Sequence, residues 1–321
     1  MSVPRWLRRH VTLLSAYGLC LLLFAVATGY SRGFASAANL RQIFVFSAFV
    51  GFAALGQTIV VLAGGLDLSV PWLMAFGGIQ LSHWAGAGGL PDWLIIVLVV
   101  LIGAAVGLAN GIGVTLLGVS PIIMTLGVGG LIQAYLLSIG LLQSTGNQVP
   151  SSAVRLATGR VGGVPVIALV WLGLALAAGF VLARTAFGRR VYAVGANAAV
   201  ARLSGVAVTR VRIATYVIAG ATSTLAGVVL AGYIGTSYLD IGQPYLFASV
   251  AAVAVGGASI LGGRGSYWGT IAGALTLTVL SDMLPLFHLK DPALDIVYGI
   301  VILVGVYLSR LGRLLARGTA E

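Results

Sequence analysis

Asp67 is the residue whose place in the sequence most clearly suits chemistry. It stands in the segment GGLDLS (64–69), between two apolar stretches. An ionisable side chain near membrane depth is costly, and it is by default a candidate for a functional role such as coupling to an ion. The alternative is structural, because the carboxylate could accept hydrogen bonds from backbone N–H groups at the start of the next helix. Both interpretations place Asp67 inside the protein and away from lipid.

Polar residues within the apolar stretches form a second set of candidates. Asn110, between Ala109 and Gly111, is the best placed of them to line a pathway. Hydrogen bonding between helices, at about 1 kcal/mol or less for each contact, is the alternative role for the whole set, which comprises Gln57, Thr58, Asn110, Thr115, Thr125, Gln133, Thr222, Ser223, Thr224 and Ser281. Acids at the ends of the later stretches are expected in solvated loops and helix caps; they are Asp240, Asp282, Asp291 and Asp295.

The sequence lacks the residue sets that several enzyme classes need. A nucleotide-binding P-loop uses a lysine to reach the phosphates, and the single lysine, Lys290, is followed by Asp291 and Pro292. HExxH is absent, and GxSxG is not accompanied by a suitably placed histidine and acid. The three histidines are far apart, and Cys20 is the single cysteine, so no metal-ligand cluster is indicated. We therefore expect no catalytic residues, no metal site and no cofactor in this chain.

Composition identifies the environment that holds these residues. Of 321 residues, 59% are hydrophobic and 8% are charged, and the mean hydropathy is +1.07. Soluble domains carry about 25% charged residues, so we expect an all-α polytopic membrane protein. The net charge of +11 would suggest nucleic acid as a partner in a soluble protein. Here the arginines gather in loops and tails, as the positive-inside bias of membrane proteins explains.

Ten apolar spans are expected, at 11–29, 43–63, 70–84, 93–117, 121–142, 164–183, 213–233, 246–262, 267–287 and 294–309. An even number of spans puts the Arg-rich segments before the first span, around 184–212 and after the last span on one side, which the positive-inside bias makes cytoplasmic. Both termini are then cytoplasmic. The third span is short and broken, and small residues such as Gly103, Gly107 and Gly220 permit close approach of helices. We expect one transmembrane domain over 1–321.

The segment 184–212 is the largest predicted cytoplasmic loop, and it carries six arginines and no acid. Its centre has the signals of a short helix. Asn197 is a good N-cap, and Gly205 suits the left-handed residue that follows a helix. The intervening AAVARLS has room for about two turns. Such a helix is either part of a basic connector that touches lipid head groups or a docking element for a cytoplasmic partner.

Three sequence blocks resemble the membrane permeases of ribose-type sugar ABC importers. They are AGGLDLSV (63–70), VYAVGANAAVARLSGV (191–206) and AAVAVGGASILGGRGSYWGTIAGA (251–274). They are similar to the family's GG-[IL]-DLS signature, to its segment with G-x-N and A-R-x-S-G, and to its GG-[TA]-S-x-x-GG-x-G block. The blocks occur in the same order, and the resemblance covers about 40–310.

The resemblance implies a bacterial inner-membrane protein that works with several partners. These are a second permease copy, identical or not, a cytoplasmic ABC ATPase and a periplasmic sugar-binding protein. It also implies that the 197–205 helix is the coupling helix that sits in a groove of the ATPase, through Gly195, Asn197, Ala201, Arg202, Ser204 and Gly205. Gly64, Gly65, Asp67 and Ser69 match the signature near the translocation path, to which we add Asn110.

Two departures from the family pattern stand out. Many members carry proline and an acidic residue after the asparagine, where this chain has Ala198, Ala199 and Val200. A salt link from that position to the ATPase is therefore in doubt. Many members also carry Glu-Leu-Asp before the third block, where this chain has Tyr245-Leu246-Phe247. The loss of two acids there suggests a different substrate or a heterodimeric partner.

Two hypotheses from different classes follow. The first is the permease subunit of an ATP-driven importer for a monosaccharide or a related small polar solute, with no rich set of sugar-binding carboxylates of its own. The second is a self-contained carrier driven by an ion gradient, with Asp67 as the coupling residue.

Overall fold

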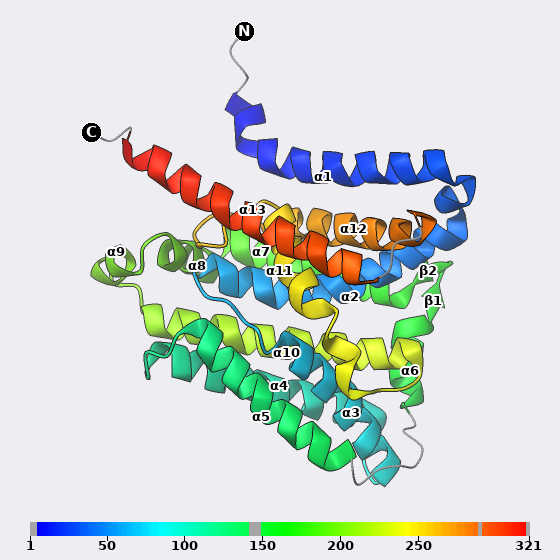
Figure 1. Cartoon of the computed structure of the whole chain (residues 1–321). Helices are drawn as coiled ribbons and strands as arrows, with labels where there is room; N and C mark the ends of the chain where they lie inside the picture. Colours follow the sequence, from blue (N-terminus) through cyan, green and yellow to red (C-terminus); the bar gives the residue numbers. More distant parts are fainter. Residues whose placement is uncertain (1–4, 141–148, 288–290, 319–321) are drawn as a thin grey trace.

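The computed structural model describes residues 5–140, 149–287 and 291–318 (Figure 1). Lys290 and His288 lie outside the described residues, as do the side chains of the first and last arginine clusters. Each of the ten expected spans overlaps one helix: α1 Arg5–Tyr30, α2 Ala37–Leu62, α3 Val70–Ala87, α4 Asp92–Thr115, α5 Pro121–Gly140, α7 Val166–Arg184, α10 Val208–Ile234, α11 Tyr245–Val255, α12 Tyr267–Met283 and α13 Asp291–Gly318.

Shorter elements connect these helices. They are α6 Ser151–Thr158, α8 Ala186–Ala196, α9 Ala198–Leu203, the 3-10 turns η1 Arg32–Ala35, η2 Leu239–Gly242 and η3 Leu284–Phe287, and the hairpin of β1 Arg160–Val161 with β2 Val164–Pro165. The expectation of an all-α chain therefore needs one small correction for this two-stranded hairpin. Seven helices of the described part are long and apolar enough to cross a membrane, and shorter apolar helices add to them.

One expected span ends earlier than predicted. The apolar pattern suggested a helix over 246–262, but α11 stops at Val255. The reason is the glycine content of the next ten residues. Gly257, Gly262, Gly263 and Gly265 all take positive φ values, which break a right-handed helix and which glycine adopts without a Cβ penalty. The third sequence block is therefore an irregular loop between α11 and α12.

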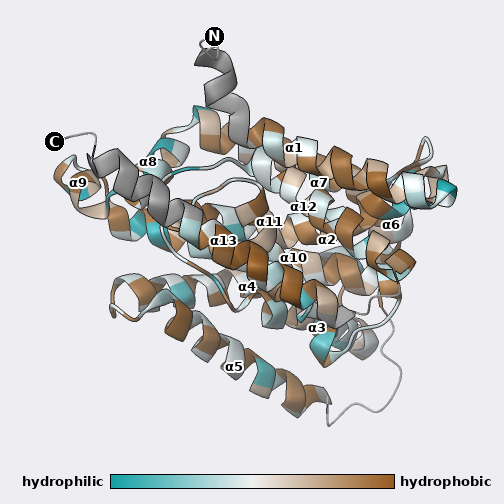
Figure 2. Ribbon diagram, turned by 45° about the horizontal axis from the view of Figure 1, so that its top comes forward, coloured by the Kyte–Doolittle hydropathy of each residue, from teal (hydrophilic) through white to brown (hydrophobic). Residues whose placement is uncertain are grey.

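Helices α2 and α10 form the centre of the bundle. Buried side chains make up 94% of the apolar window of α2, compared with 11% for α1, which packs along α12 at the edge. A helix that is apolar all round is typical of a position inside a bundle. Figure 1 shows α1 and α5 on opposite sides of this centre, and Figure 2 shows apolar residues along the outer helices.

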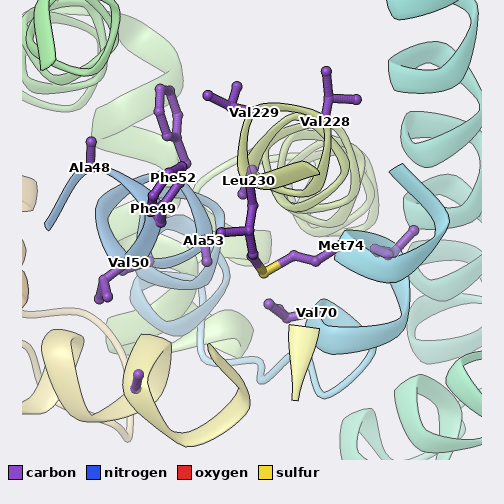
Figure 3. Packing of buried hydrophobic residues seen from close by; sticks show 14 of the residues in the cluster. Ala48, Phe49, Val50, Phe52, Ala53, Val70, Met74, Val228, Val229 and Leu230 are labelled. Carbon is purple, nitrogen blue, oxygen red and sulfur yellow. The ribbon is translucent and has the colours of Figure 1, made fainter. Parts of the chain in front are cut away.

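The contact between α4 and α10 depends on small residues. A side chain at Gly103 or Gly107 of α4 would overlap the backbone or side chains of α10, and one at Gly220 of α10 would overlap the backbone of α4. The expectation of close helix approach at these glycines is confirmed. Next to this contact, Met74 of α3 points toward Ala53 of α2 and Leu230 of α10 (Figure 3).

Candidate functional site

The three sequence blocks, far apart along the chain, meet at one place. Gly64 follows α2, Gly195 is near the end of α8, and Gly262 and Gly263 lie in the loop after α11. The N–H of Gly263 donates a hydrogen bond of 3.0 Å to the carbonyl oxygen of Leu62. We call Leu62, Gly64, Gly195, Gly262 and Gly263 the glycine junction. It ties the α2–α3 turn to the α8–α9 loop.

The junction requires glycine because main chain packs directly on main chain. A Cβ at Gly195 would overlap the Leu62 carbonyl oxygen and would lie 2.6 Å from the Gly263 nitrogen. A Cβ at Gly262 would lie 2.9 Å from the Gly64 Cα. Real Cβ atoms do not approach other atoms this closely, so any side chain at these positions would push the segments apart. The α8–α9 loop therefore cannot shift far without moving the end of α2.

Tyr192 adds a side-chain link to the same place. Its hydroxyl, on α8, donates a 2.9 Å hydrogen bond to the carbonyl oxygen of Gly265. Burial raises the pKa of Tyr192, so the hydroxyl stays protonated and remains a donor at neutral pH. Sequence reasoning missed Tyr192 as an individual residue, although it lies within the second block. Its hydrogen-bond partner is a main-chain carbonyl, which every residue has, so the sequence does not indicate this contact.

Asp67 lies next to the junction, in the turn between α2 and α3. Its side chain is 0% exposed, and its Oδ1 accepts from both the backbone N–H (2.9 Å) and the hydroxyl of Ser69. The amide of Asn110 on α4 donates to the Ser69 hydroxyl oxygen at 3.0 Å. The signature predicts Asp67 and Ser69 near the path, Asn110 is predicted from its place among apolar residues, and the structure joins the three into one buried hydrogen-bonded chain.

Some polar atoms around this hydrogen-bonded chain have partners and others do not. The Tyr216 hydroxyl donates to the Leu66 carbonyl at 3.3 Å, and the Leu68 N–H donates to the Thr125 hydroxyl at 3.0 Å, so neighbouring helices hold the turn on both sides. Among the described residues, Asp67 Oδ2 and Asn110 Oδ1 have no hydrogen-bond partner. The structure agrees with both interpretations of Asp67 in placing it away from lipid. Its contact with the Ser69 N–H matches the structural role.

The predicted helix over 197–205 is present as α9, Ala198–Leu203. The Asn197 side chain accepts from the N–H groups of Ala199 (3.0 Å) and Val200 (3.1 Å), as an N-cap does. Gly205 has φ +80°, the conformation expected just after a helix. Both capping predictions are confirmed.

The six residues expected at the coupling helix do not share one surface. Asn197, Arg202, Ser204 and Gly205 are exposed, while Ala201 is buried against the helices below. Gly195 lies back in the glycine junction. The set therefore divides into an exposed tip and an inner attachment.

The exposed tip also presents two apolar side chains that sequence reasoning missed. Val200 is 56% exposed and Leu203 is 89% exposed, and they are three residues apart on α9. Residues at this spacing share a helix face, so the pattern in AAVARL could have indicated an apolar surface patch. Figure 1 shows α9 at the end of the bundle opposite the β1–β2 hairpin.

The chain is similar in sequence to known import permeases over most of its length. The chain is 33% identical to the fructose import permease protein FrcC of Rhizobium meliloti, with 91% of this chain and 84% of the relative aligned. It is 35% identical to the autoinducer 2 import system permease protein LsrC of Klebsiella pneumoniae (95% and 88%) and 32% identical to the ribose import permease protein RbsC of Bacillus subtilis (91% of each). No solved structure matches the chain significantly.

A family profile covers most of the same region. The profile described as "Branched-chain amino acid transport system / permease component" matches residues 39–306, which include all three blocks and every helix of the glycine junction. This chain belongs to that family of ABC transporter permease components and is a multi-pass bacterial membrane protein without an ATPase site of its own.

Proposed function

We propose that the chain carries a monosaccharide, or a related small polar solute, as one transmembrane permease domain over residues 1–321. Import permeases for fructose, ribose and autoinducer 2 are similar to it over most of their length, which supports this substrate class. Family membership also argues against the self-contained ion-driven carrier, because a permease component receives its energy from a separate ATPase chain.

The tip of α9 is the proposed docking surface for that cytoplasmic ATPase. The observation that supports this proposal is the combination of exposed Val200 and Leu203 with adjacent Arg202 on a short helix capped at both ends. A solvated connector has no need to expose a leucine almost completely. An apolar groove with an acidic rim on the ATPase would fit this tip. Residues 198–200 include no acid, so they add no negative charge that an acidic rim would repel.

The glycine junction supplies the proposed mechanical link. When the ATPase closes on ATP, the force on α9 passes through Gly195 to Leu62 at the end of α2 and to Gly263 before α12. The α2–α3 turn then moves with α9, and alternating access follows. Gly64, Gly65, Asp67, Ser69 and Asn110 act at the translocation path by fixing this turn, since the side chains of Asp67, Ser69 and Asn110 are buried within the chain.

The remaining partners follow from the orientation that we propose. Six arginines lie in the segment 184–212 that includes α9, and both α1 and α13 have their chain-terminal ends nearer that end of the bundle (Figure 1). Both termini are then cytoplasmic. A periplasmic sugar-binding protein docks at the opposite end, and a second permease copy, identical or not, completes the path within the lipid bilayer.

Co-purification with the ATPase tests this proposal. The wild-type chain and three variants are each expressed with the ATPase from the neighbouring gene. The variants are Leu203→Glu, Arg202→Glu and Gly205→Pro. We expect the wild type to retain the ATPase and the three variants to lose it. Leu203→Met is the matched control, because it keeps an apolar side chain of similar volume at the tip and should bind normally.

Two results would contradict the proposal. The docking surface would be wrong if Leu203→Glu retained the ATPase as well as the wild type did. The whole assignment would fail if the purified chain alone moved ribose or fructose into liposomes without ATP.

A further inference from the structure

A cavity of about 380 Å³ lies between α2, α11, α12 and α13. It is lined by the first turns of α11 and α13, the last turns of α12 and the first half of α2. Asp282 in its wall is about 22 Å along α12 from Tyr267, at 1.5 Å per residue. Since α12 begins beside the glycine junction, the cavity lies at the end of the bundle opposite α9.

The lining of this cavity combines an apolar floor with acidic and hydroxyl groups. Phe46 and Leu277 contribute to the floor. The lining also includes residues with polar side chains, and none of its described residues is basic; the polar ones are Tyr245, Thr278, Ser281, Asp282, Asp295 and Tyr298. Two of the seven acidic residues in a chain of net charge +11 therefore share one cavity.

Asp282 is held in place from the neighbouring helix. The amide of Asn39, at the start of α2, donates to Asp282 Oδ2 at 2.8 Å and to the Phe34 carbonyl at 3.0 Å. This amide fixes the direction of the carboxylate. A carboxylate that is already oriented loses little conformational freedom when a ligand binds.

We propose that this cavity is a docking subsite for a monosaccharide on its way into the permease. A sugar offers hydroxyl donors and an apolar ring face. Ionised carboxylates are acceptors, and tyrosines combine an apolar ring with a polar hydroxyl. The volume is within the range of small-molecule sites, which are largely apolar with a few converging polar groups.

The proposal rests on the proposed function, because it takes this end of the bundle as the outer end. It is compatible with the expectation from the sequence that the chain holds no rich set of sugar-binding carboxylates, because the subsite uses two. Other cavities differ in chemistry. The one between α2, α7 and α12 is lined by apolar side chains and Arg41, and offers hydroxyl groups no carboxylate acceptor.

Direct binding to the chain in lipid nanodiscs tests the subsite. The probes are D-ribose and D-fructose, observed by saturation-transfer NMR without the binding protein. We expect a signal with the wild type and an affinity at least about tenfold lower in Asp282→Asn and Asp295→Asn, since each change removes a charged hydrogen-bond acceptor. The carboxamide oxygen introduced by Asp282→Asn can still accept from Asn39, so this variant should fold.

Asp240→Asn is the matched control. Asp240 is exposed in η2, just before α11, and does not line the cavity. It should bind both sugars as the wild type does. A wild type that binds neither sugar, or carboxylate variants that bind both unchanged, would overturn the subsite. Binding of Ca²⁺ that requires both carboxylates, without sugar binding, would identify a cation site and overturn it as well.

A transport assay separates this proposal from the function on which it rests. If the complete transporter fails to take up sugar with ATP and binding protein, the proposed function fails. If the wild type takes up sugar and the carboxylate variants match it in both uptake and binding, the subsite alone is wrong.

Discussion

At the scale of single residues, Asp67 illustrates how a functional candidate can also serve structure. One carboxylate oxygen holds Ser69, and the other has no partner among the described residues. A carboxamide oxygen can accept the same two hydrogen bonds. The substitutions Asp67→Asn and Asp67→Ala therefore separate the role of the charge from the role of the acceptor.

We expect Asp67→Asn to fold and to support ATP-driven uptake. Asp67→Ala leaves the N–H and the hydroxyl of Ser69 without their acceptor, which should cost about 1–3 kcal/mol of stability. Thermal unfolding of the purified variants measures the difference. Abolished uptake in a stable Asp67→Asn variant would instead assign the residue to ion coupling.

Gly195 provides a second prediction at this scale. In Gly195→Ala the new methyl group overlaps the Leu62 carbonyl oxygen. Overpacking of this kind typically costs about 1–3 kcal/mol, and the backbone of α2 cannot move aside as a side chain would. We expect a lower unfolding temperature and weaker stimulation of the ATPase by loaded binding protein.

Gly127→Ala in α5 is the control for this change. Gly127 has open space around its Cβ position, and alanine is favoured over glycine inside a helix by roughly 0.5–1 kcal/mol. This variant should be as stable as the wild type or slightly more stable. Equal stability of Gly195→Ala and Gly127→Ala would contradict the close packing of the junction.

At the scale of elements, the α9 helix was predictable because its signals are local. Asn197 and Gly205 are the two ends of one short segment, and each acts on the few residues beside it. The meeting of Gly64, Gly195 and Gly262 could not be predicted in the same way. The contact is made by main chain, so the sequence supplies glycines but nothing that pairs one with another.

Loss of the N-cap should loosen α9 without affecting the bundle. Asn197→Ala removes the acceptor for the N–H groups of Ala199 and Val200, at a cost of about 1 kcal/mol. We expect faster hydrogen exchange of the backbone amides over 198–204 and unchanged exchange in α10. Asn197→Asp, which keeps the cap, should exchange as the wild type does.

At the scale of the whole molecule, the order of the helices was predictable and their rotation was not. Apolar length located each long helix, as α4 and α7 illustrate. Which face of α12 lines the cavity depends on packing across the bundle. Asp282 and Asp295 were therefore assigned to loops and caps, while the structure places both in the wall of one cavity.

Membrane orientation supplies the prediction at this scale. In a Cys20→Ser background, Arg202→Cys on α9 and Asp240→Cys in η2 introduce single exposed thiols at positions that we expect on opposite sides of the membrane. A membrane-impermeant maleimide should label Asp240→Cys in intact spheroplasts and Arg202→Cys only in inverted vesicles. Labelling of both from one side would contradict the proposed topology.

The composition of the glycine junction has a consequence for how such transporters diversify. Its contacts run through main-chain atoms, and main chain is indifferent to the identity of the cargo. Substitutions that change the lining of the cavity at the other end can accumulate without disturbing the contacts of the glycine junction. A lineage of such transporters can thus change its substrate and keep the same coupling between the ATPase and the permease. Chimaeras that graft outer segments between relatives should respect this boundary and remain coupled.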